Sequence, residues 1–234
     1  MKIKEIICSK SLTGFYFDDQ AAIKKGAVQD GFNYLGEPIT DKFIAIRQKG
    51  EAVSIMFILE DGQVGVGDAA AVQYSGAGGR DPLFIADEGI EILEEKIRPL
   101  LIGKDVSTFK ELAEEIDSLK IEGKLIHTAL RYGLTQALLD STAKANKITM
   151  TEVVRKEYNI GSDVYNRIPM FAQTGDDRYT NVDKMILKEV EVMPHALINN
   201  IETKLGLKGE ILKEYVVWLR NRVLKLRQSD DYNP

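Results

Sequence analysis

The first group of residues that could bind a ligand consists of a glutamine and the glycine-rich loop that follows it. The segment QYSGAGGRDP runs from Gln73 to Pro82 and places glycines directly before Asp81, a predicted helix start. Backbone N–H groups at such a position can bind an anion, and the Gln73 amide can hold a polar group. The spacing matches neither the dinucleotide-binding fingerprint nor the P-loop. An anion-binding loop and a flexible connection between sheet and helix therefore both remain open.

A second glutamine, Gln173, ends a short apolar run at residues 168–173 and precedes the polar segment TGDDR. Loops that follow strands carry the ligand-binding groups of β/α folds. Asp176 and Asp177 look like metal ligands, but adjacent side chains rarely point at one ion. We interpret this acid pair as structural, because the N-terminal end of a helix favours negative charge.

His195 follows Pro194 in the irregular segment MPHALINN. An imidazole in such a place can act as an acid, a base or a carboxylate-binding group. The other histidine, His127, adjoins an amphipathic stretch, and we expect it to pack or to lie on the surface. Two histidines exclude a histidine-rich metal site, and the single cysteine Cys8 excludes an internal disulfide, which favours a reducing compartment.

The composition is that of a folded protein with a small molecule or a protein as its partner. The chain has 234 residues, of which 44% are hydrophobic and 29% charged, with a formal net charge of -5. No basic field exists to attract nucleic acid. The apolar run at residues 55–59 is far shorter than the roughly 20 residues that span a bilayer, and Glu5 interrupts the N-terminal run. We expect a soluble, cytoplasmic protein that binds neither nucleic acid nor membranes.

The first eighty residues have the pattern of an antiparallel sheet. We predict strands at 2–8, 42–48, 52–59 and 64–68, with the Asp61–Gly62 pair forming the turn of a hairpin. Residues 12–40 show no sustained period and are predicted to be a long loop.

Helical signals begin at Asp81. Proline follows this predicted N-cap, and an apolar face continues through Ile90, Leu93, Ile97 and Leu100 to Gly103. Capping boxes are predicted at 108–111 and 149–152, and residues 126–138 form an amphipathic stretch with a face of small residues. Residues 1–160 thus predict an α+β domain in which helices cover the sheet.

A second unit is predicted from residue 161 onward. It begins with the strand at 168–173 and continues with a helix whose apolar positions include Val182, Met185, Ile186 and Val190. The last predicted helix covers residues 209–228, with its apolar face at Leu212, Val216, Leu219, Val223 and Leu226. A β-loop-α unit of this kind is the repeating element of a β/α fold.

Five segments together resemble one family, the 3-methylaspartate ammonia-lyases of the enolase superfamily. They are FYFDDQ at 15–20, RQKGE at 47–51, AAVQYSGAGGRDPLF at 70–84, GDDRY at 175–179 and MPHALINN at 193–200. The resemblance runs along the whole chain and corresponds to the amino-terminal half of the enzyme. It implies an α+β capping domain at 1–160 and the first part of an incomplete TIM-type barrel at 161–234.

The resemblance also implies a reaction, the Mg²⁺-dependent anti elimination of ammonia from (2S,3S)-3-methylaspartate to mesaconate in glutamate fermentation. It implies that His195 contacts the substrate carboxylate as a catalytic residue, that Gln173 binds substrate, and that Gln73 lies near the substrate amine. The family's Mg²⁺ ligands and lysine base have no counterparts in the chain, so we expect them from a carboxyl-terminal half of the same enzyme, and a homodimer. The alternatives are a non-catalytic binding or assembly fragment and another enolase-superfamily enzyme such as a cycloisomerase.

Overall fold

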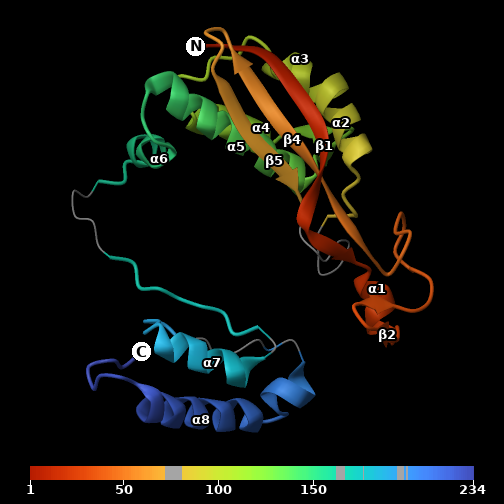
Figure 1. The fold of residues 1–234 in the computed structure, drawn as a ribbon. Helices are drawn as coiled ribbons and strands as arrows, with labels where there is room; N and C mark the ends of the chain where they lie inside the picture. Colours follow the sequence, from red (N-terminus) through yellow and green to blue (C-terminus); the bar gives the residue numbers. More distant parts are fainter. Residues whose placement is uncertain (72–80, 162–166, 176, 194–197, 199) are drawn as a thin grey trace. The chain divides into compact units, whose positions relative to one another are not determined.

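The structure is a computed structural model that describes residues 1–71, 81–161, 167–175, 177–193, 198 and 200–234. It divides into two compact units, Met1–Gly161 and Ser162–Pro234. The larger unit combines an antiparallel sheet with helices (Figure 1). The α+β class predicted for this region is confirmed.

Three antiparallel strands form the sheet of the first unit in the order β1-β4-β5. They are β1 (Ile3–Asp18), β4 (Arg47–Leu59) and β5 (Val64–Ala70). The predicted hairpin turn is present, and Gly62 has the positive φ of 85° that favours glycine. Two short hairpins accompany the sheet, β2 (Gln29–Asp30) with β3 (Asn33–Tyr34), and β6 (Lys120–Ile121) with β7 (Lys124–Leu125).

One strand prediction and one loop prediction are wrong in part. The strand predicted at 52–59 is present as part of β4, which begins already at Arg47, whereas residues 42–46 form no strand. The predicted loop at 12–40 is partly ordered, since β1 continues to Asp18 after a register shift and is followed by the helix α1 (Gln20–Lys24). Pairing with the long strand β4 supplies hydrogen bonds to a segment whose own pattern is irregular, and Phe17 is fully buried there.

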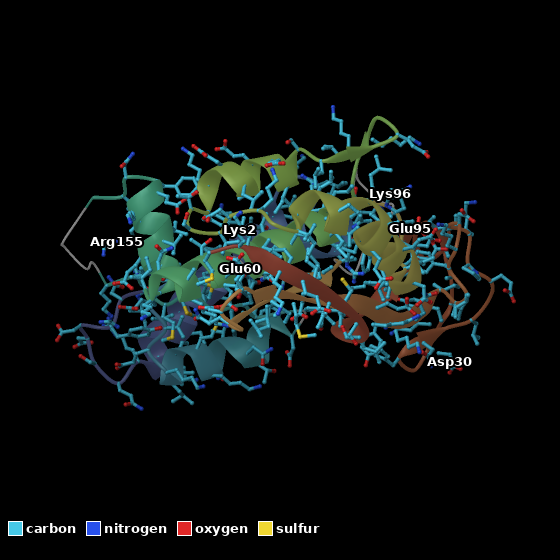
Figure 2. The ribbon with its side chains drawn as sticks, turned by 90° about the horizontal axis from the view of Figure 1, so that it is seen from above. Lys2, Asp30, Glu60, Glu95, Lys96 and Arg155 are labelled. Atoms are coloured by element: carbon cyan, nitrogen blue, oxygen red, sulfur yellow. The ribbon has the colours of Figure 1, made fainter. Side chains whose placement is uncertain are left out.

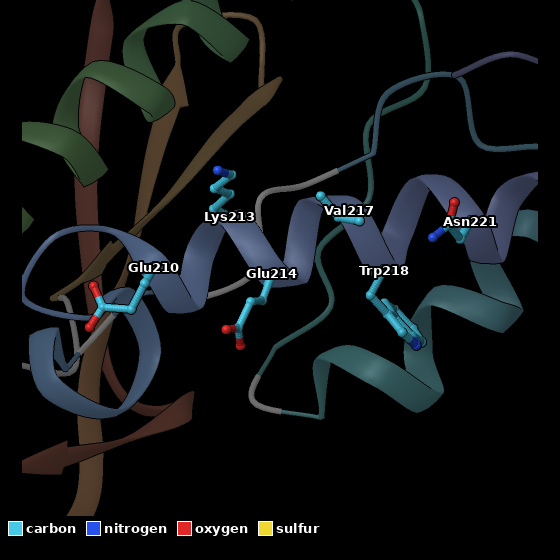
Figure 3. A pocket seen from close by; sticks show the side chains of 6 residues that line it. All are labelled: Glu210, Lys213, Glu214, Val217, Trp218 and Asn221. Carbon is cyan, nitrogen blue, oxygen red and sulfur yellow. The ribbon is translucent and has the colours of Figure 1, made fainter.

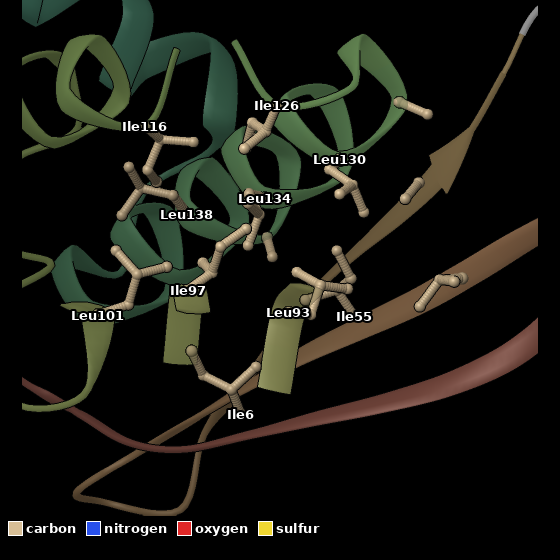
Figure 4. Close-up of a cluster of buried hydrophobic side chains, with 14 of the residues drawn as sticks. Ile6, Ile55, Leu93, Ile97, Leu101, Ile116, Ile126, Leu130, Leu134 and Leu138 are labelled. Carbon is tan, nitrogen blue, oxygen red and sulfur yellow. The ribbon is translucent and has the colours of Figure 1, made fainter. Parts of the chain in front are cut away.

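Helices cover the sheet of the first unit (Figure 1). They are α2 (Ala86–Ile92), the π-helical turn η1 (Leu93–Ile97), α3 (Arg98–Leu101), α4 (Lys110–Asp117), α5 (Thr128–Asn146) and α6 (Met150–Glu157). The buried face of this layer meets the buried side of the strands in one cluster (Figure 4). On the opposite surface, charged side chains such as Glu95 and Lys96 point outward (Figure 2).

Helix-start predictions had mixed outcomes. The capping box at Thr149 and Glu152 is confirmed. The one predicted at 108–111 is wrong, because the backbone N–H groups of Phe109 and Lys110 donate to Glu157 instead. The helix predicted from Asp81 begins only at Ala86.

Asp81 and His127 accept hydrogen bonds from backbone N–H groups at the start of α5. The Asp81 carboxylate accepts a hydrogen bond of 2.7 Å from the Thr128 N–H. The His127 Nδ1 accepts one of 3.0 Å from the Ala129 N–H, and its Nε2 donates to the Pro82 carbonyl at 3.1 Å. His127 therefore caps this helix, which is a structural role.

Glycines let α5 lie directly on β5. A Cβ on Gly133 would come within 2.6 Å of the Ala69 nitrogen, and one on Gly67 would collide with the Gly133 carbonyl oxygen. Polar side chains of α5 also bond the edge of β5: Asp140 accepts from the Val66 N–H and Lys144 donates to the Val64 carbonyl. This strand edge is thereby covered within the unit.

The second unit is built from helices in its described residues. They are α7 (Arg178–Leu187), the π-helical turn η2 (Ile201–Leu205) and α8 (Glu210–Leu226). A small core joins α7 and α8 through Val182, Ile186, Tyr215 and Val223.

The strand predicted at 168–173 is wrong for the described residues. Only a single parallel bridge between Phe171 and Val192 forms there, and Ile168 is 87% exposed. A strand needs a flanking partner for its hydrogen bonds, and one bridge does not supply it. The predicted face of α8 is also wrong in part, since Tyr215 is buried and Val216 is exposed.

Candidate functional site

Of the three residues predicted to contact substrate, the structure describes Gln173. Its side chain is exposed and follows the bridge that Phe171 makes with Val192. An amide in this position can both donate and accept hydrogen bonds. Gln73 and His195 lie outside the described residues, so the structure does not place them against Gln173.

The loop after Gln173 is tied to the start of α7. Thr174 is buried, and its carbonyl accepts a 2.8 Å hydrogen bond from the Asn181 side chain. Gly175 has a φ of 60°, which favours glycine. Asp177 occupies the N-cap position of α7 but makes no side-chain cap hydrogen bond there, and Asp176 lies outside the described residues.

Behind this loop lies a buried arginine that the sequence pattern did not reveal. Arg178 is 8% exposed, and its guanidinium carbon stands 5.4 Å from the Tyr179 ring centroid and 4.9 Å from that of Tyr215. Trp218 stacks on Tyr215 with ring centroids 5.9 Å apart. The signal available in the sequence was an aromatic residue beside an arginine at a helix start, which is too common to single out.

A second set of buried charges holds the segment between β1 and β4 in the first unit. The Arg47 guanidinium makes two hydrogen bonds to Asp18, of 2.7 and 2.9 Å, and lies over the rings of Phe32 and Tyr34. Bidentate arginine–carboxylate pairs of this kind are strong and directional. The motif residues FYFDDQ and RQKGE thus meet in space and fix the end of the sheet.

Asp19 organises the same segment. Its carboxylate accepts hydrogen bonds from the backbone of Ala21, Ile39 and Thr40 and from the Thr40 hydroxyl. Burial acts to raise the pKa of Asp19, but these hydrogen bonds outweigh it and lower the pKa to about 2. The carboxylate is therefore a structural anchor that stays charged.

Further features of the described residues bear on the chemistry that the chain can support. Among the described residues no three of His, Cys, Asp and Glu converge to hold a metal ion, so these residues do not make a Mg²⁺ site. Burial raises the pKa of Cys8 to about 11, which keeps its thiol neutral.

A groove along α8 is lined by mixed charges, with Glu210, Lys213 and Glu214 beside Trp218 (Figure 3). No helix in the described part of the chain is long and apolar enough to cross a bilayer.

Comparison with solved structures finds the same fold in another enzyme of known structure. Muconate lactonizing enzyme from Pseudomonas fluorescens superposes with a TM-score of 0.54 at 15% identity, covering 97% of this chain and 51% of that chain. Residues 1–159 match the family described as "Methylaspartate ammonia-lyase N-terminus", and residues 163–234 match "Methylaspartate ammonia-lyase C-terminus". The chain belongs to the methylaspartate ammonia-lyase family.

Similar proteins agree on this family. Methylaspartate ammonia-lyase from Clostridium tetanomorphum is 60% identical over 234 residues, which are 100% of this chain and 56% of that protein. A crystal structure of β-methylaspartase from the same organism, a Mg complex, covers the whole chain with a TM-score of 0.90. The Citrobacter amalonaticus enzyme, solved containing (2S,3S)-3-methylaspartic acid, has a TM-score of 0.91 at 58% identity and is covered over 57% of its chain. This chain therefore spans about half the length of the relatives it matches, their amino-terminal portion.

Proposed function

We propose that this protein takes part in the elimination of ammonia from (2S,3S)-3-methylaspartate to give mesaconate, in glutamate fermentation. The observation that carries the proposal is 60% identity to a methylaspartate ammonia-lyase over every residue of the chain. A relative 58% identical is solved containing (2S,3S)-3-methylaspartic acid, the proposed substrate. The match extends over both units and covers the segments that contain Gln73, Gln173 and His195.

The three candidate residues take complementary roles in this proposal. The exposed Gln173 amide donates to a substrate carboxylate, Gln73 lies near the amine, and His195 contacts the carboxylate as negative charge develops on it. Removing the weakly acidic C3 proton places a second charge next to that carboxylate. Positioned hydrogen-bond donors stabilise such charge by roughly 100- to 1,000-fold in rate, which is too little to replace a base.

The rest of the catalytic apparatus comes, in this proposal, from the part of the family's length that the chain does not span. A relative is solved as a Mg complex, whereas the described residues of this chain contain no cluster able to hold a metal. We therefore route no step of the reaction through a metal held by this chain. Residues 1–160 would act as a capping domain and 161–234 as the first part of a barrel, in a homodimer completed by a carboxyl-terminal half.

The test is mesaconate formation, measured first with the isolated chain and then with the chain mixed with or fused to a carboxyl-terminal half. We expect no turnover in the first case and turnover in the second. In the active form, His195→Ala and Gln173→Ala should each lower the rate, while Asn181→Ala, which alters the same loop but removes no group proposed to contact substrate, serves as the control. Turnover by the isolated chain, or full activity of His195→Ala, would contradict the roles proposed for these residues.

A non-catalytic binding or assembly role is the second candidate. In that role the chain would contribute a binding surface and no turnover. The mixing experiment separates the two functions, because an assembly module would bind a carboxyl-terminal half or another partner without restoring turnover.

A further inference from the structure

Arg178 is charged and more than nine-tenths buried, yet it has no acidic partner among the residues that the structure describes. Its one direct hydrogen bond runs from Nη1 to the Lys204 carbonyl at 3.4 Å, a long contact. Buried arginines are normally paired with an anion, since removing the charge from water is costly. The rings of Tyr179 and Tyr215 attract the cation through their faces, but they do not accept hydrogen bonds from the edge of the guanidinium fork.

Tyr215 adds a second, independent observation at the same place. Its side chain is fully buried, and its hydroxyl has no hydrogen-bond partner in the described residues. A buried hydroxyl without an acceptor costs free energy that a native structure normally recovers. The ring that carries this hydroxyl is the one over which the Arg178 guanidinium lies, 4.9 Å from its centroid.

We propose that Arg178 and the Tyr215 hydroxyl form a binding site for a carboxylate. A carboxylate has the planar pair of acceptors that fits the guanidinium fork, and it has lone pairs left for a hydroxyl donor. The adjacent acid Asp177 adds negative charge at the start of α7, which favours a singly charged carboxylate over a doubly charged phosphate. Arg222 and Asp183, which also join α7 and α8, neutralise each other in a bidentate pair. Arg178 differs from the exposed cations of these two helices because it is buried and forms no ion pair with a described residue.

The carboxylate can come from an acidic side chain of the carboxyl-terminal portion found in the relatives or from a free molecule. Trp218, the single tryptophan of the chain, is stacked on Tyr215 and reports occupancy through its fluorescence. The probes are acetate and succinate, titrated into the intact 234-residue chain at constant ionic strength, with chloride as the reference anion. We expect a saturable change with the carboxylates that chloride does not produce.

Variants identify the site. Arg178→Gln should weaken carboxylate binding at least tenfold, as expected for losing hydrogen bonds to a charged group. Tyr215→Phe keeps the stacked ring and should weaken carboxylate binding several-fold. Arg220→Gln changes an exposed arginine of the same helix and should leave carboxylate binding unchanged. Far-ultraviolet circular dichroism checks that each variant folds; if Arg178→Gln does not, Tyr215→Phe decides. An equal response to chloride, or unaltered affinity in the variant that decides, overturns the proposal.

Adding a carboxyl-terminal half of the enzyme distinguishes the two possible sources of the carboxylate. If its side chain supplies the carboxylate, Trp218 fluorescence changes on mixing and free succinate then has no effect. If the site takes a free carboxylate, the succinate titration persists in the complex. Both outcomes support the site, and neither depends on turnover, so a failure of the proposed lyase function would be seen separately.

Discussion

The two units of this chain differ in how completely each one buries its own apolar side chains and pairs its own backbone groups. In the first, a continuous core joins the sheet to its helices, and long polar side chains cover the edge of β5. In the second, a few buried residues join α7 to α8, while Ile168, Met170 and Phe171 are exposed. A run with the composition of a buried strand is exposed because its described neighbours provide a single bridge. The contrast teaches that both units can match one family although they differ in how well each is packed by itself.

The strongest test of this contrast is limited proteolysis of the intact chain. We expect the first cleavages between residues 161 and 234, because poorly packed segments open more often than a continuous core. The product should be a resistant fragment of residues 1 to about 160, identified by mass. Equal resistance along both units would contradict the comparison and indicate a self-sufficient second unit.

The contact between α5 and β5 should be the most sensitive point of the first unit. Gly67→Ala places a Cβ against the Gly133 carbonyl, a rigid backbone group, and should lower the free energy of unfolding by about 3 kcal/mol. Urea unfolding followed by circular dichroism measures it. Gly14→Ala, where a Cβ meets nothing within 4 Å, is the matched control and should change stability little.

Asp19 should give the first unit a specific acid sensitivity. Its pKa is lowered to about 2 from an ordinary 3.8, so its stabilisation is fully present above pH 3.8 and is lost as the pH falls toward 2. The amount is about 2 kcal/mol at neutral pH. Asp19→Asn should lose this stability at pH 7 and approach the parent at low pH, measured as unfolding free energy against pH. Parallel curves for the two proteins would refute the assignment.

The tertiary cap on α4 should have the smallest effect. Glu157→Ala removes the acceptor for the N–H groups of Phe109 and Lys110 and should cost about 1 to 2 kcal/mol. Glu114→Ala, an exposed acid on α4 itself, controls for the loss of charge. Thermal unfolding of the three proteins compares them, and a parent-like Glu157→Ala would show that water satisfies these groups equally well.

Some residues of the candidate site could be predicted from the sequence, and others were found only in the structure. Gln173, Gln73 and His195 follow from residue type and family resemblance, and their roles stay predictions. Arg178 and Tyr215 were missed, because an arginine is expected at the surface from sequence alone. Its burial depends on aromatic side chains of α8, more than thirty residues away in the sequence.

Local signals in the sequence were sufficient where the interacting residues are neighbours along the chain. The Asp61–Gly62 turn and the capping box of Thr149 and Glu152 follow from contacts within a few residues. The extension of β1 to Asp18 and the capping of α4 by Glu157 were decided only in the tertiary structure. Their partners are brought close by the fold of the whole unit, and a backbone hydrogen bond is met by whichever acceptor the fold places nearest.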